Sequence, residues 1–165
     1  GAYTQLGYCS LFGMGLAPNV DTTQKLFAKA VSLKHQNAQI FMDYCSKNGI
    51  SLDNGAAVMK QIATAAKSGD ATAQFLMGEF YSDGCGVKMD EKAMMAYYAQ
   101  AAKQNYAPAL SALSWAYEMG MLVKENRETA IQLAIRAAEQ GDADALTYLN
   151  TVGQVEFEEE TQPAN

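Results

Sequence analysis

Several residue types are scarce in this chain of 165 residues, and each scarcity argues against a class of function. Basic side chains are outnumbered, with 12 Lys and Arg against 18 Asp and Glu. The net charge of −6 argues against nucleic acid as a partner, because phosphate binding needs a clustered positive field. No apolar run approaches the roughly 20 residues that span a bilayer. We therefore expect no nucleic-acid binding and no membrane insertion.

The remaining composition is that of a globular protein, with 49% hydrophobic and 18% charged residues. The length suggests one domain that buries about 70% of its unfolded surface. The chain begins Gly1-Ala2 without methionine, which we interpret as the boundary of a longer protein or a processed terminus. Cytoplasmic, periplasmic and secreted locations therefore all stay open, with the first favoured.

A ladder of alanines runs through the whole sequence at a nearly constant period. Its members, spaced by 36, 35, 36 and 36 residues, are Ala2, Ala38, Ala73, Ala109 and Ala145. Two further rows keep the same register: Leu6, Met42, Met77, Leu113 and Leu149, and the glycines Gly13, Gly49, Gly84 and Gly120. A period in this range is typical of a solenoid, in which each repeat is one supersecondary unit.

Each repeat is expected to be a pair of helices. In the third, apolar residues at helical spacing predict a helix from about Ala71 to Ser82 that ends at Gly84. The second helix of each pair has an N-cap residue at the repeat period, namely Asn19, Asn54, Asp90 and Asn126. The repeats therefore predict four helical pairs and a ninth helix, from about Ala143 to Val152. We assign residues 1–152 to the repeat domain and 153–165 to an acidic, flexible tail.

These rows resemble the Sel-one-like repeat (SLR) family, a relative of the tetratricopeptide repeats. The best match runs from Ala73 to Gly84, continues with Gly86-Val87 and the Asp90 cap, and ends at Ala101-Ala102. The second repeat departs most, because Asp43, Ser46 and Ser51 replace the usual Gly, Tyr and Gly. The resemblance implies an all-α fold, a right-handed superhelix of antiparallel helix pairs. It also implies a scaffold for protein–protein contacts with no common catalytic residue.

The family's geometry would place the first helix of each pair on the concave face of the stack. The row that packing leaves free, together with neighbours one turn away, would then bind a partner segment: Tyr8, Ile40, Tyr44, Phe75, Glu79, Trp115 and Glu118. Tyr and Trp are favoured in binding hot spots. We expect a monomeric adaptor that binds another protein or a peptide there. The alternative is a dedicated immunity or inhibitor protein that neutralises one toxin or enzyme.

Catalytic and cofactor sites find little support. Three cysteines cannot all pair within one chain, and Cys9 and Cys45, one repeat apart, should be too distant for a disulfide. We expect reduced thiols, with Cys85 the most exposed because two glycines flank it. A cysteine nucleophile or a zinc site would both need His35, the single histidine. We expect no catalytic residue, no metal and no cofactor.

Met42, Met77 and Met94 fall on packing rows. We therefore expect these methionines to fill the core and not to form an adaptable binding surface.

Overall fold

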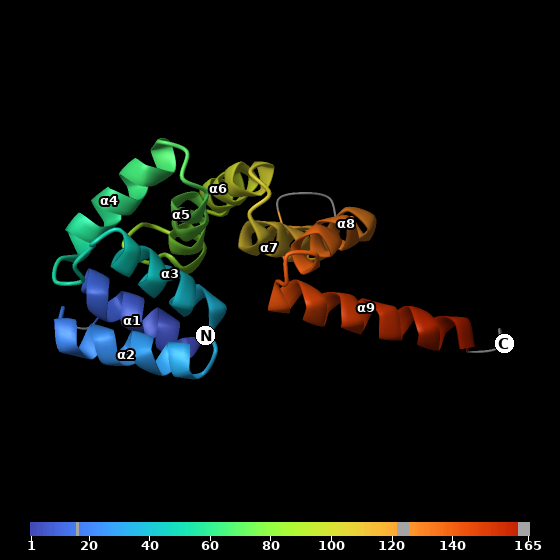
Figure 1. Cartoon of the computed structure of the whole chain (residues 1–165), viewed down its shortest axis with the longest axis horizontal. Helices are drawn as coiled ribbons and strands as arrows, with labels where there is room; N and C mark the ends of the chain where they lie inside the picture. The colour runs from blue at the N-terminus through green and yellow to red at the C-terminus, as the bar shows by residue number, and fades with distance from the viewer. Residues whose placement is uncertain (16, 122–125, 162–165) are drawn as a thin grey trace. The chain divides into compact units, whose positions relative to one another are not determined.

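The computed structural model describes residues 1–15, 17–121 and 126–161, with side chains described only as far as Val152. The described chain is helical and contains no strand, which confirms the predicted all-α class (Figure 1). The helices of this described part are α1 (Ala2–Phe12), α2 (Val20–Ser32), α3 (Gln36–Lys47), α4 (Gly55–Lys67), α5 (Ala71–Asp83), α6 (Glu91–Lys103), α7 (Ala107–Glu118), α8 (Arg127–Ala138) and α9 (Ala143–Thr161).

The periodic N-caps are confirmed at atomic level. At the start of α2, α4, α6 and α8, a cap side-chain oxygen accepts a hydrogen bond from the backbone N–H three residues later, at 2.9 to 3.1 Å. Each bond satisfies a donor that the first helical turn would otherwise leave open. The caps are the predicted residues Asn19, Asn54, Asp90 and Asn126.

The glycine row ends the first helix of each pair. Gly13, Gly49, Gly84 and Gly120 all have φ between 62° and 67°, the left-handed region that glycine adopts without a steric penalty. The same turn therefore recurs in every repeat, including the second, whose other positions depart from the family pattern.

The chain divides into two compact units, Gly1–Tyr97 (unit 1) and Tyr98–Asn165 (unit 2). The core of unit 1 is an aromatic cluster of Tyr8, Phe12, Phe27, Phe41 and Phe80. The ring of Tyr8 lies 5.1 to 5.2 Å from those of Phe27, Phe41 and Phe80, each in an edge-to-face arrangement. Such pairs stabilise a core beyond the area that they bury. Helices α1, α2, α3 and α5 are thus joined through one ring.

A glycine lets α4 approach α1 closely. A Cβ atom at Gly55, the first residue of α4, would lie 2.3 Å from the carbonyl oxygen of Leu11 near the end of α1. No side chain can occupy that space unless the backbone moves. Gly55 therefore sets how closely the first and second repeats meet in unit 1.

Unit 2 is packed through small side chains. Ala109 and Ala116 of α7 and Ala130, Ala134 and Ala137 of α8 are all fully buried. The hydroxyl group of Ser114 donates a hydrogen bond of 2.7 Å to the carbonyl oxygen of Ala130, between the same two helices. Helix α9 begins after its cap Asp142 and runs to Thr161, beyond the predicted end at Val152. The flexible tail over 153–165 stays a prediction.

Candidate protein-interaction surface

Three aromatic residues of the predicted binding row lie inside unit 1 instead of on its surface. Tyr8 and Phe75 are 1% and 2% exposed, and Tyr44 is 8% exposed. Tyr8 is the centre of the aromatic cluster, where its ring is held by α2, α3 and α5. The prediction that these rings are accessible to a partner is therefore wrong.

The contact between α1 and the end of α5 accounts for the burial of Tyr8. The side-chain amide of Gln5 donates to Asp83 Oδ1 at 3.4 Å, and the rings of Phe12 and Phe80 lie 5.4 Å apart. Beyond α1, the backbone N–H of Gly86 donates to the sulfur of Met14 at 3.2 Å. Helix α1 thus covers the part of α5 that the repeat pattern alone would leave open.

The other two predicted residues of unit 1 are only half-buried. Ile40 lines a shallow surface pocket of about 320 Å³ together with Val31, Lys34, His35, Gln36 and Gln39. Glu79 accepts a hydrogen bond from the side-chain amide of Asn37, which joins α5 to the start of α3. Ile40 is therefore available at the surface, whereas the carboxylate of Glu79 has an internal role.

In unit 2 the predicted residues do reach solvent. Trp115 is 55% exposed, and Met119, one helical turn later, is 62% exposed. Glu118 is half-buried, and its Oε2 atom accepts a hydrogen bond of 2.8 Å from the hydroxyl group of Tyr148 on α9. Sequence reasoning missed Tyr148, because its row in the other repeats is Gln5, Phe41, Leu76 and Ala112, with no shared property.

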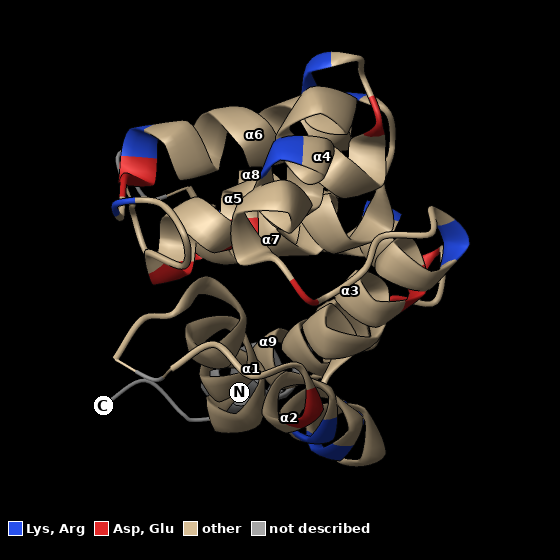
Figure 2. Cartoon of the chain, turned by 90° about the vertical axis from the view of Figure 1, so that its left-hand side faces the viewer, with Lys and Arg blue, Asp and Glu red and all other residues tan. Residues whose placement is uncertain are grey.

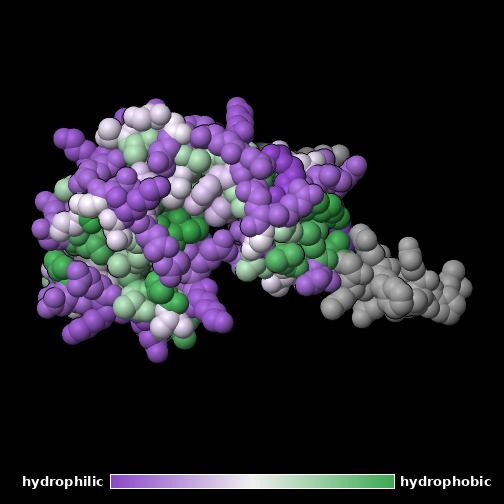
Figure 3. Space-filling model, viewed as in Figure 1, coloured by the Kyte–Doolittle hydropathy of each residue, from purple (hydrophilic) through white to green (hydrophobic). Residues whose placement is uncertain are grey.

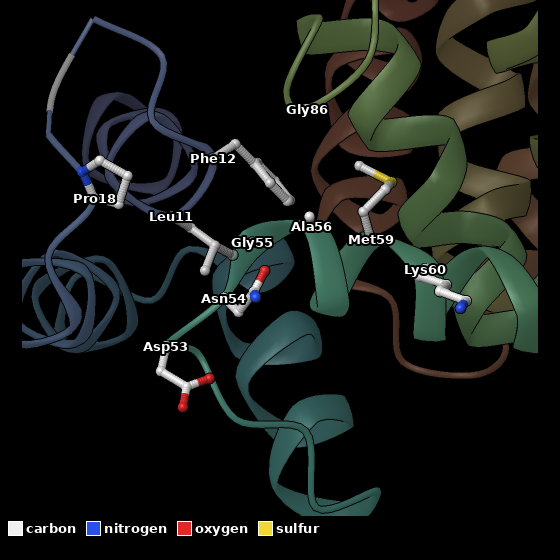
Figure 4. A pocket seen from close by; sticks show the side chains of 10 residues that line it. All are labelled: Leu11, Phe12, Pro18, Asp53, Asn54, Gly55, Ala56, Met59, Lys60 and Gly86. Atoms are coloured by element: carbon white, nitrogen blue, oxygen red, sulfur yellow. The ribbon is translucent and has the colours of Figure 1, made fainter.

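A second opening lies in unit 1, at the start of α4. This groove has a volume of about 560 Å³ and is lined by residues of α1, α4 and three loops, among them Leu11, Phe12, Pro18, Met59 and Gly86. Figure 4 shows Phe12 and Met59 pointing toward each other below Gly86, while Asp53 and Lys60 point away from them. The groove is therefore apolar at its centre and charged only at its rim.

Among the described residues, no potential metal-binding group joins the cysteines to His35, and two of the three cysteines are buried. Cys85, predicted to be the most exposed, is buried, and Cys9 is the more accessible thiol. The prediction was wrong because the loop around Cys85 folds back under the end of α5, where its N–H bonds to the carbonyl oxygen of Phe80. Burial raises the pKa of both Cys45 and Cys85 to about 12, so both are protonated near neutral pH and neither can start a reaction as a free thiolate.

Other site classes also find no support in the described residues. They contain no group of three His, Cys, Asp or Glu residues that could hold a metal ion. None of the described helices is both long enough and apolar enough to cross a lipid bilayer.

In unit 1, basic and acidic residues are interspersed among the helices and loops that face the viewer in Figure 2. On the face shown in Figure 3, hydrophobic atoms form separate areas, one of them over unit 2.

Two solved bacterial structures are similar to this chain. One is a Sel1 repeat protein from Oxalobacter formigenes, 28% identical, with a TM-score of 0.56; the match covers 90% of this chain and 61% of that chain. The other is a protective antigen present in uropathogenic Escherichia coli strains and displaying an SLR fold. It is 25% identical, with a TM-score of 0.56, over 92% of this chain and 33% of that chain. This chain therefore spans under two thirds of either relative's length.

The comparison with protein families agrees with the structure. The Sel1 repeat matches residues 1–35, 71–106 and 107–142, which together make up well over half of the chain. Residues 36–70, the repeat with the departures at Asp43, Ser46 and Ser51, lie outside these matches. No curated protein sequence matches the chain. The chain belongs to the Sel1 repeat family, whose members generally act as protein-interaction modules and are typically non-enzymatic.

Proposed function

We propose that this protein binds a segment of a partner protein on the surface of α7 around Trp115. The observation that carries the proposal is the exposure of this ring, 55%, in a chain that buries Tyr8, Tyr44 and Phe75. Exposed tryptophan is uncommon on a folded surface and is enriched in binding hot spots, because it buries a large area at a low entropic cost.

Neighbouring residues define what this surface would accept. Met119 adds a flexible apolar side chain one turn from Trp115, which suits an aliphatic or aromatic group of the partner. The carboxylate of Glu118 is held in place by Tyr148 and can accept a basic side chain. The net charge of −6 favours a basic partner in the same way. We therefore propose a segment that combines an apolar anchor with a Lys or Arg residue.

Ile40 marks a smaller candidate contact in unit 1. Its pocket is partly apolar and has Lys34 and His35 at its edge. We propose it as a secondary contact, since no exposed aromatic ring lines it among the described residues.

The test starts with capture of partners from the native source by the intact chain, followed by mass spectrometry. For a recovered partner, Trp115→Ala should weaken binding by about thirtyfold or more, the effect of losing a hot spot of about 2 kcal/mol. Met89→Ala is the matched control, because Met89 is 60% exposed but lies in unit 1. The affinity of Met89→Ala for the partner should equal that of the unmodified protein.

Equal affinities for the two variants, with both folded by circular dichroism, would contradict the proposal. One tight partner would indicate a dedicated inhibitor or immunity protein, whereas several weak partners would indicate an adaptor.

A further inference from the structure

Cys9 faces the segment of unit 1 that carries Cys85. On α1, Gln5, Cys9 and Phe12 lie on one face, because residues three and four positions apart are neighbours on a helix. Gln5 bonds to Asp83, and the ring of Phe12 lies 5.4 Å from that of Phe80 and beside Gly86. Contacts with residues 80–86 therefore occur on both sides of Cys9 along this face.

The loop that carries Cys85 lies beside this face of α1, since Gly86 is next to the ring of Phe12. Gly84 and Gly86 both have positive φ, 66° and 71°, so the chain reverses on each side of Cys85. Its sulfur is buried and lies 3.9 Å from the carbonyl oxygen of Asp83. The pKa of Cys85 is raised to about 12, first by burial and then by the charges of Asp83, Cys9 and Glu79. The contacts of Gln5 with Asp83, and of Phe12 with Phe80 and Gly86, place the two cysteines on neighbouring segments.

We propose that Cys9 and Cys85 are a reversible oxidation site, which a peroxide converts into a disulfide between α1 and the loop after α5. Cys9 is the initiating residue because it is the accessible thiol. Its sulfur attacks the O–O bond of hydrogen peroxide, giving a sulfenic acid and one water molecule. The sulfur of Cys85 then displaces the hydroxyl group from Cys9, and the proton of the Cys85 thiol leaves with it as a second water molecule. A dithiol reductant reverses the change.

The bond would stabilise a contact that is otherwise non-covalent. Residues 9 and 85 stand far apart in the sequence, and a disulfide that closes a long loop restricts the unfolded chain strongly. The oxidised protein should unfold at a temperature higher by about 5 °C or more. The proposal is independent of the Trp115 surface, because all of its residues lie in unit 1.

The test treats the reduced, intact chain with hydrogen peroxide, blocks the remaining thiols, and digests the product with trypsin without reduction. Trypsin places the three cysteines in separate peptides, 1–25, 35–47 and 68–88. The expected product is monomeric, has lost two hydrogen atoms, and contains peptides 1–25 and 68–88 joined together. Reduction should return both the mass and the lower unfolding temperature.

Two variants separate this disulfide from other outcomes. Cys45→Ser should still form the bond, whereas Cys9→Ser, a change at a half-exposed position, should not. A link between peptides 1–25 and 35–47 would overturn the proposal. So would a dimer joined through Cys9, or a Cys9 sulfinic acid beside an unmodified Cys85.

Discussion

Two buried hydroxyl groups differ in how the core accommodates them. Ser114 donates to a backbone carbonyl oxygen at 2.7 Å, and its side chain is 3% exposed. The hydroxyl oxygen of Tyr8 is also buried but has no hydrogen-bond partner among the described residues. Burial, with a smaller effect of the Glu79 charge, raises the pKa of Tyr8 well above its usual value. The phenol therefore stays protonated and desolvated in the aromatic cluster.

Tyr8→Phe should consequently leave the free energy of unfolding unchanged or raise it by up to about 2 kcal/mol. The substitution keeps the ring contacts and removes a polar group that is costly to bury. Ser114→Ala should lower it by about 1 kcal/mol, because a buried hydrogen bond between α7 and α8 is lost. Urea unfolding of both variants measures the difference. A loss of more than about 1 kcal/mol in Tyr8→Phe would show that the hydroxyl group has a stabilising partner.

At this scale the sequence could not predict which members of a row are exposed. Tyr8 and Trp115 occupy equivalent positions, three repeat periods apart, yet one is 1% and the other 55% exposed. Tyr8 is buried by Phe80, which is distant in the sequence and belongs to the third repeat. A periodic pattern describes contacts between neighbouring repeats, whereas the contact of α1 with α5 joins the first repeat to the third. The sequence predicted that Trp115 is exposed only because the whole row was expected to be exposed.

The helices themselves were the most predictable part of the structure. Their N-caps and the glycines at their ends are local signals, and repetition at one period made each signal more reliable. The predicted helix from about Ala71 to Ser82 is α5, which ends one residue later, at Asp83. The end of α9 was predicted too early. Gly153, directly after Val152, is a typical residue for a helix end, but the glutamates that follow it are good helix formers, and the first proline after Val152 is Pro163.

The cap of α4 offers a test at the scale of one element. Asn54→Ala removes the acceptor of a 3.1 Å hydrogen bond from the N–H of Ala57 and should lower the free energy of unfolding by about 1 kcal/mol. Asn54→Asp keeps an acceptor there and adds a negative charge at a helix N-terminus, so its stability should match the wild type. Thermal unfolding measures both. Equal destabilisation by the two variants would mean that the amide group has another role.

For the molecule as a whole, the division into two units predicts a local response to core damage. Phe41 is fully buried and contacts the rings of Tyr8 and Phe27 at 5.1 and 4.8 Å. Phe41→Ala should destabilise unit 1 by about 3 to 5 kcal/mol. In repeat proteins, stability is approximately a sum of local terms and nearest-neighbour terms. Hydrogen exchange should therefore accelerate more in α1–α5 than in α7 and α8.

Mass spectrometry after timed exchange resolves the two regions. An equal loss of protection in α7 and α8 would show that the chain unfolds as one cooperative body. Leu113→Ala, in the core of unit 2, is the reciprocal variant, since Leu113 is 7% exposed. Its main effect should fall on α7 and α8.

The contact of Gly55 with Leu11 limits how this protein could be redesigned. Positions equivalent to Gly55 in the other repeats hold Val20, Glu91 and Arg127, all with side chains. A consensus repeat built from these neighbours and substituted for residues 36–70 would place a Cβ atom 2.3 Å from the Leu11 carbonyl oxygen. The repeats of this chain are thus not interchangeable parts, and the one that departs most from the family pattern is fitted to its own position.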